Sequence, residues 1–355
     1  MKKIFKAGWV ILALGVVLAI VGAAFNGVKA VEFNGFKVQT VKKDTAITKT
    51  YAKKEFERIE FVNGSGYFVP MELEIRQGQD YSVSYSGSSR FEPKIDYQNG
   101  TLKVARGQEM HGFSFDLNNY QSKIDSKLII TVPENVKLSF VKVNGNYDNI
   151  KLEKLNIATL ELEADSSEKL SLNEVTTERT DIDMNTDEVT ITNSKLNNGE
   201  LSLDRVADLV VSGGELTNIN VKVDSEGRVY YKDGLVLNGG GTQLADEVYG
   251  YESDDDNDAD NDSDADNDSD YADNLEPSAD LDADTITIKG KYEIKNNSGA
   301  TRIMNATVQG YRLTNKHGEN NLHDQQQTNG GTLEENADQA DVLTLSSQTG
   351  ENTVK

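Results

Sequence analysis

The sequence predicts an all-β chain, a β-solenoid or closely related stack of strands with about 20 residues per coil, behind a single N-terminal transmembrane helix. Three observations predict it. An uncharged apolar stretch runs from Ala7 to Val28, short runs of alternating apolar residues follow from Lys54 onward, and these runs recur at a fixed spacing between 140 and 232. The 355 residues include no cysteine, which excludes a disulfide framework, a thiolate metal site and a thiol nucleophile.

Residues 1–30 are predicted to be a short cytoplasmic tip and a transmembrane signal anchor. Lys2, Lys3 and Lys6 precede the apolar stretch of 22 residues, and about 20 apolar residues span a bilayer as a helix. The stretch is longer than the apolar region of about 7–15 residues in a cleaved signal peptide, although cleavage after Ala30 is the alternative. The residues expected to contact membrane lipid are Trp9, Leu12, Leu14, Val17, Leu18, Ile20, Val21 and Phe25.

Lysines flank the apolar stretch on both sides in nearly equal number, so the positive charge is a weak guide to which end of the helix faces the cytoplasm. The short basic N-terminus resembles an export signal, and we therefore expect a single-pass protein of the bacterial cell membrane with the bulk of the chain extracellular. Residues 31–54 are predicted to be a basic linker. Its lysines either stay solvated or attract anionic lipid headgroups and wall polymers.

Residues 55–250 are predicted to form the strand-repeat domain. One series of apolar pairs steps by 19, 22, 19 and 20 residues, and a second steps by 20, 19, 20 and 20. Each unit then has two short strands joined by polar turns, and stacked units bury the apolar face that one unit cannot bury alone. An antiparallel sandwich is the alternative, but it does not require like residues at like positions. The first series is Val141/Val143, Leu160/Leu162, Ile182/Met184, Leu201/Leu203 and Val221/Val223; the second is Ile150/Leu152, Leu170/Leu172, Val189/Ile191, Leu209/Val211 and Val229/Tyr231.

Two segments and the repeat together resemble a known family. Phe56–Phe61 (FERIEF), then Lys127–Pro133 (KLIITVP), then the two-strand coils are similar to the bacterial family of candidate adhesins that includes LiaG-like proteins. The resemblance covers roughly residues 54–232, and Leu343–Gly350 looks like a closing coil. It implies a domain of unknown function built from β-strand repeats, often behind a membrane helix, with no established catalytic residues. The turns that match the family pattern are Asn144–Asn146, Ala164–Ser167, Asn185–Asp187 and Asp224–Gly227.

Residues 251–284 are predicted to be an Asp-rich disordered insertion. Every second residue from Asp256 to Asp270 is Asp. The segment therefore has no apolar side chains to bury, and its carboxylates repel one another. Weak collective binding of divalent cations is the alternative; a defined calcium loop would need a glycine, and residues 251–289 contain none. Residues 285–355 are expected to continue the β-repeat, with a separate small β-domain as the alternative.

The sequence contains no catalytic motif, and the net charge of −23 comes mainly from the insertion, so no basic stripe suggests nucleic acid. His317 and His323 lack a third spaced ligand, and we expect no metal, cofactor or catalytic residue. The predicted function is a membrane-anchored extracytoplasmic β-repeat protein of the cell envelope, an adhesin-like module that binds an envelope protein or polysaccharide without catalysis. The alternatives are an accessory or sensor protein of a cell-envelope stress response and, less favoured, a carbohydrate-active β-solenoid enzyme.

Overall fold

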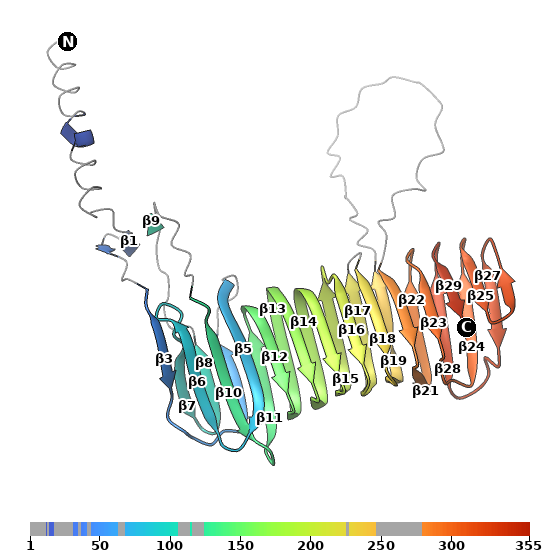
Figure 1. Ribbon diagram of the computed structural model, residues 1–355. Helices are drawn as coiled ribbons and strands as arrows, with labels where there is room; N and C mark the ends of the chain where they lie inside the picture. Colours follow the sequence, from blue (N-terminus) through green and yellow to red (C-terminus); the bar gives the residue numbers. More distant parts are fainter. Residues whose placement is uncertain are drawn as a thin grey trace, which may run out of the picture.

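The computed structural model describes residues 12, 14–17, 31–34, 37–40, 44–62, 68–105, 114–115, 124–224, 227–245 and 279–355. Most of these residues form one elongated stack of β-strands, in which each coil of the chain lies against the next (Figure 1). Neighbouring strands are parallel along the stack and antiparallel near its two ends. The fold is therefore all-β and mostly parallel, as predicted for a solenoid.

The strands fall into two rows along the stack, and each row is one hydrogen-bonded face. The first row, in spatial order, is β7 (Lys94–Gln98), β8 (Thr101–Ala105), β4 (Arg58–Val62), β11 (Lys137–Asn144), the first parts of β13 (Asn156–Asn173) and β14 (Thr176–Thr192), β15 (Lys195–Asp204), β17 (Glu215–Asp224), β19 (Val236–Ala245), β21 (Thr287–Lys289) with β22 (Lys291–Asn296), β28 (Val342–Ser347), β24 (Gly310–Asn315) and β27 (Gly331–Glu335).

The second row lies across the apolar interior from the first. In spatial order it is β3 (Ala46–Thr50), β6 (Ser82–Ser88), β10 (Lys127–Pro133), β5 (Phe68–Gly78), β12 (Asn146–Glu153), the second parts of β13 and β14, β16 (Asp208–Ser212), β18 (Arg228–Lys232), β20 (Asp280–Asp284), β23 (Thr301–Met304), β29 (Glu351–Val354), β25 (Glu319–Leu322) and β26 (Gln325–Gln327).

Residues 31–54, expected to be a linker, contain strands. β1 (Val31–Asn34) pairs antiparallel with β2 (Lys37–Thr40) and with β9 (Ser114–Phe115) in a separate small sheet. β3 pairs with β6, and Ile47 packs against the core of the stack. The strand stack therefore begins before residue 55, because the ladder to β6 and the apolar side chain of Ile47 hold β3 at its edge.

The register confirms the second apolar series and corrects the first. All five pairs of the second series stand opposite one another on neighbouring coils. In the first series Leu162, and not Leu160, stands opposite Ile182, so the irregular step of 22 residues disappears. The partner of Leu160 is Thr180, which is fully buried and whose hydroxyl lies 2.7 Å from that of Thr177. The regular period of about 20 residues was hidden in the sequence because Thr180, a polar residue, occupies a core position and bonds there to Thr177.

Two of the four predicted turns lie between strands, since Asn144–Asn146 joins β11 to β12 and Asp224–Gly227 lies between β17 and β18, whereas the other two differ from the prediction. Ala164–Ser167 and Asn185–Asp187 lie within the continuous strands β13 and β14, with only a register shift between Ala164 and Ser167. A residue with left-handed backbone stands at the start of each new coil. In the first four of these coils, the backbone N–H of that residue donates to a carbonyl of the next coil. These corner residues are Lys154, Glu174, Asn193, Gly213 and Asp233.

The C-terminal strands form a coil, but not the closing coil that the sequence suggested. β28 lies between β22 and β24, and β29 lies between β23 and β25. The stack ends instead with β24 to β27, whose antiparallel outer strands are polar and largely exposed. In Figure 1 the C-terminus accordingly lies inside the stack and not at its tip.

The predicted insertion 251–284 reaches too far at its C-terminal end. Asp280–Asp284 forms β20, which pairs with β18 and β23 and buries Leu281 and Ala283. Alternation of Asp with apolar residues marks a half-buried strand here, whereas alternation of Asp with Asn, Ala and Ser does not. The Asp256 to Asp270 run, with its predicted disorder and cation binding, lies outside the described residues.

Candidate binding groove

Outward-facing side chains stand in columns along the first row. Successive residues of a strand point to opposite faces, and parallel strands in register repeat about every 4.8 Å, so each column has one residue per coil. The register places carboxylates beside one another on three consecutive coils. One column is Lys142, Glu161, Asp181, Glu200 and Asn220, and the next is Asn144, Glu163, Asp183, Ser202 and Lys222.

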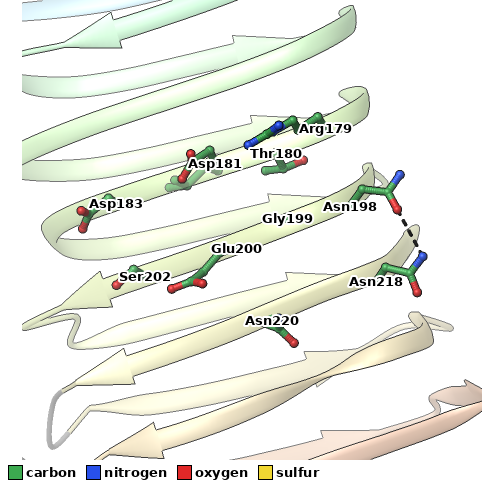
Figure 2. A pocket seen from close by; sticks show the side chains of 11 residues that line it. Arg179, Thr180, Asp181, Asp183, Asn198, Gly199, Glu200, Ser202, Asn218 and Asn220 are labelled. Atoms are coloured by element: carbon green, nitrogen blue, oxygen red, sulfur yellow. Dashed lines mark hydrogen bonds between the residues drawn. The ribbon is translucent and has the colours of Figure 1, made fainter.

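A shallow groove of about 660 Å³ crosses β14, β15 and β17 on this face (Figure 2). Gly199 allows β15 to approach β14 closely at this point, because a Cβ at this position would lie 1.6 Å from the carbonyl oxygen of Thr180. The side chains drawn around it are polar: Arg179, Asp181, Asp183, Asn198, Glu200, Ser202, Asn218 and Asn220. Sequence reasoning missed all of them, since only the register reveals which outward residues are neighbours.

Charge is neutralised at the two sides of the groove but not at its centre. Lys142 pairs with Glu161 at 3.1 Å, and Lys222 pairs with Glu200 at 2.7 Å. The hydrogen bond to Glu161 raises the pKa of the Lys142 ammonium, as do the charges of Glu161 and Asp181. Asp181 and Asp183 are exposed, and the carboxylate of neither makes a hydrogen bond or ion pair with another of the residues that the structure describes. The groove therefore offers carboxylates free to accept hydrogen bonds.

Two asparagines form an amide ladder at one end of the groove. Asn218 donates from Nδ2 to Oδ1 of Asn198 at 3.2 Å, and Asn198 donates to the carbonyl of Glu178 at 3.0 Å. Both have left-handed backbone, with φ of 51°. The next position in the column is Gly239, which has no side chain to continue the ladder. The amides and the carboxylates thus line the same shallow surface.

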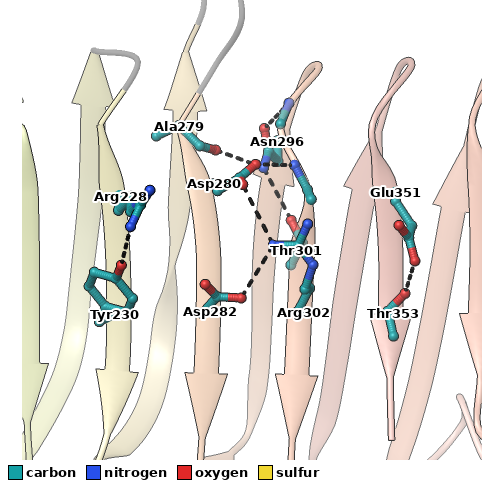
Figure 3. Close-up of polar contacts among 12 residues, drawn as sticks. Arg228, Tyr230, Ala279, Asp280, Asp282, Asn296, Thr301, Arg302, Glu351 and Thr353 are labelled. Carbon is teal, nitrogen blue, oxygen red and sulfur yellow. Dashed lines mark hydrogen bonds and ion pairs between the residues drawn. The ribbon is translucent and has the colours of Figure 1, made fainter.

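Several charges on the outward face of the second row are paired with one another. Arg302 lies 3.5 Å from both Asp280 and Asp282, and Arg228 donates to the hydroxyl of Tyr230 at 3.3 Å (Figure 3). On neighbouring coils Lys169 contacts Glu188 at 2.5 Å, and this hydrogen bond lowers the pKa of the Glu188 carboxyl. These paired charges are therefore less available to a ligand than the carboxylates of Asp181 and Asp183.

The described residues include no group of three His, Cys, Asp or Glu side chains placed to hold a metal ion. His323 contacts Glu335 at 3.0 Å and packs edge-on against Tyr311, whose ring centroid is 5.4 Å away. The backbone N–H of His317 donates to the carbonyl of Gln348 in the neighbouring coil. The two histidines thus have different surroundings and do not form a shared site.

Of the predicted membrane-contacting residues, the structure describes Leu12, Leu14 and Val17, which are helical and exposed. The others lie outside the described residues: Trp9, Leu18, Ile20, Val21 and Phe25. Within the part of the chain that is described, no helix has the length and apolar character needed to cross a bilayer. The anchor therefore stays a prediction.

Residues 69–354 match the family model described as Toastrack DUF4097. A candidate adhesin from Bacteroides fragilis is similar over 88% of this chain and 97% of its own, with 11% identity and a TM-score of 0.34. A candidate adhesin from Parabacteroides merdae is similar over 74% of this chain and 94% of its own, with 14% identity and a TM-score of 0.30. A candidate lipid-binding protein from Parabacteroides distasonis is similar over 87% of this chain and 97% of its own, with 11% identity and a TM-score of 0.32. No curated protein matches the sequence.

Proposed function

The chain belongs to the Toastrack DUF4097 family, and from that premise we propose that it is an adhesin-like, non-catalytic binding module of the bacterial cell envelope. In this proposal the N-terminal apolar stretch holds the protein at the cell membrane, and the β-solenoid lies outside. The groove over β14, β15 and β17 binds a polysaccharide of the envelope.

The observation that carries this proposal is the column arrangement of the groove. The carboxylates of Asp181 and Asp183 have no hydrogen-bond or ion-pair partner among the described residues, while the pairs Lys142–Glu161 and Lys222–Glu200 lie on either side of them. A carboxylate accepts two or more hydrogen bonds, and an amide both donates and accepts. The groove thus suits a ligand rich in hydroxyl groups.

A rigid stack also suits an extended ligand better than a compact one. The groove crosses three coils, and its polar groups repeat at the strand spacing of about 4.8 Å. Its openness to one side allows a polymer to enter laterally and to continue beyond the groove in both directions. A chain of sugar units meets both requirements, because it is extended and carries hydroxyl groups on every unit.

Binding is tested with the soluble protein from residue 31 onward and purified envelope polysaccharides, measured by isothermal titration calorimetry. The double variant Asp181→Asn/Asp183→Asn should weaken binding at least tenfold. The matched control is Glu168→Gln/Asp187→Asn, which removes two exposed carboxylates from a corner outside the groove and should bind normally. Equal binding by both variants, or binding to no polysaccharide, would reject the groove.

Membrane topology needs its own test, because the flanking lysines are nearly balanced. A reporter active only outside the cytoplasm, fused after residue 250, should be active in intact cells. An active cytoplasmic reporter at the same position would reverse the orientation. Crosslinking that captures only a membrane protein partner, with no polysaccharide, would instead favour the sensor role in an envelope-stress response.

A further inference from the structure

The last fourteen residues of the chain, 342–355, occupy a slot between two coils that precede them in sequence. One wall of the slot is β22 with β23, and the other is β24 with β25. Without the segment, these walls would stand about 9.6 Å apart, twice the spacing of paired strands. We call residues 342–355 the C-terminal segment and this gap the acceptor slot.

The first strand of the segment pairs along its whole length with both walls. Every residue of β28 from Val342 to Ser347 has a register partner on β22 and another on β24. Leu343 and Leu345 point into the core and are fully buried. The segment therefore completes two ladders at once and fills the apolar interior between them.

The second strand is held in the same way, with buried amides added. The backbone N–H of Lys355 donates to the carbonyl of Ile303 on one side, and the backbone N–H of His323 donates to the carbonyl of Val354 on the other. Asn352 is buried, and its Nδ2 donates to Oδ1 of Asn320 at 2.9 Å and to the carbonyl of Thr314 at 3.2 Å. These contacts fix the register of β29 as well as its place.

The corner between the two strands fits its neighbours closely. Gly350 lies between the corners at Gly299 and Gly318, and a Cβ on Gly350 would come within 2.1 Å of the carbonyl oxygen of Gly299. Asn315 donates from Nδ2 to the carbonyl of Gly350. The slot thus selects for shape at this corner, because no residue larger than glycine fits without moving backbone.

The chain reaches the slot through one short connection. β27 lies on the outer side of β24, and residues 336–341 pass around the start of β24, where a Cβ on Gly310 would come within 2.0 Å of the carbonyl oxygen of Asn336. Residues 338–340 are exposed. The segment pairs with β22 to β25 and not with β27, so its pairing does not depend on the strand that leads to it.

We propose that the acceptor slot is a strand-binding site for residues 342–355, filled in cis by this segment of the same chain and in trans by the same segment of a second copy. The recognised features are the alternating Leu343 and Leu345, the glycine at the corner and the amide of Asn352. When the exposed connection swings outward, the segment can enter the slot of a second copy. The two copies are then joined by the same contacts that the segment makes within one chain, and no other interface is needed. This inference is independent of the groove.

The first test cuts the connection and asks whether the segment still binds. A protease site is inserted between Asp338 and Gln339 of the full chain, and the purified protein is cleaved. The released fragment should remain bound through gel filtration and should exchange with a fluorescent peptide of residues 342–355 after warming. A peptide with Gly350→Ala should exchange at least tenfold less. Loss of the fragment without uptake of the peptide would overturn the proposal.

The second test needs no cleavage and uses two full-length variants. Thr353 stands opposite Asn321 of the neighbouring strand, and the chain has no cysteine of its own. Thr353→Cys and Asn321→Cys chains, unfolded together and refolded at high concentration under mild oxidation, should form a disulfide-linked pair of copies. The control replaces the second variant by Asp96→Cys, which lies at the other end of the stack. Equal yields from the two mixtures would contradict trans insertion.

Discussion

The carboxylate of Asp341 accepts a hydrogen bond of 2.7 Å from the backbone N–H of Gly290, although 51 positions separate the two residues. The N–H of Val342 then donates to the carbonyl of Gly290 at 2.9 Å, so β28 starts directly beside β22. Gly290 has left-handed backbone, with φ of 69°, which turns its N–H toward Asp341. This contact fixes the point at which the C-terminal segment enters the stack.

Replacing Asp341 by Ala should therefore loosen the C-terminal coil. A hydrogen bond to a charged group contributes about 1.5–3 kcal/mol when it is shielded, and Asp341 is half-buried, so we expect a loss near the lower end. Urea unfolding followed by circular dichroism measures it. Asp338→Ala removes an exposed carboxylate from the same connection and should change the free energy of unfolding by less than about 0.5 kcal/mol. Equal losses from both variants would show that the Gly290 contact is unimportant.

Thr242 joins two buried tyrosines inside the stack, and its loss should be costly. Its hydroxyl lies 2.8 Å from the hydroxyl of Tyr231 and 2.8 Å from that of Tyr292, and all three residues are buried. Thr242→Val removes this partner from both buried phenols, which then have only one another to bond, and a buried polar group left unsatisfied costs about 1–3 kcal/mol. We expect the free energy of unfolding, measured in urea, to fall by about 1–3 kcal/mol.

The control for this prediction removes the polar groups on both sides. The triple variant Thr242→Val/Tyr231→Phe/Tyr292→Phe should be more stable than Thr242→Val alone, because replacing all partners by apolar groups leaves nothing unsatisfied. Burial also raises the pKa of Tyr231 to about 12 and raises that of Tyr292. Because the unfolded chain ionises near pH 10, native stability should fall as pH rises above about 10, and less so in the triple variant.

Glu74 should make stability depend on pH in the acid range. Burial alone would raise the pKa of its carboxyl, but the hydrogen bond from Lys127 and the charges of Lys127 and Arg76 hold it below its usual value. The unfolded state then binds the proton more readily, so this stabilisation is present above about pH 4.3 and is lost as pH falls through the folded value.

Glu74→Gln should accordingly lower the free energy of unfolding by about 1–3 kcal/mol at pH 7. The difference from the unmodified protein should shrink as the pH is lowered from about 5 to 3. Thermal melts across this range measure it, with the exposed Glu55→Gln as the matched control. A difference that is constant with pH would mean that Glu74 contributes packing and not charge.

The sequence predicted the strands well because their apolar residues alternate without interruption. Ile150 and Leu152, for example, predicted both their strand and its register against Leu170 and Leu172. The period failed at Thr180, because a buried threonine that bonds to another threonine looks the same in sequence as an exposed one.

The order of the coils was not predictable from the same pattern. Leu343 and Leu345 alternate as any coil does, and alternation says which face is buried but not which strand lies beside it. The groove was hidden for a related reason. In the sequence Asp181 and Asn198 look like ordinary exposed residues, and they line one hollow only because the register places their coils side by side.

The coil order is tested most directly by disulfide mapping in a chain that has no cysteine. Thr353 stands opposite Arg302 on one side and Asn321 on the other. The variants Arg302→Cys/Thr353→Cys and Thr353→Cys/Asn321→Cys should each form an internal disulfide. Arg302→Cys/Asn321→Cys should not, because its strands stand about 9.6 Å apart, beyond the limit of about 7 Å for a disulfide. Efficient crosslinking of this third pair, with failure of the first two, would contradict the inserted C-terminal coil.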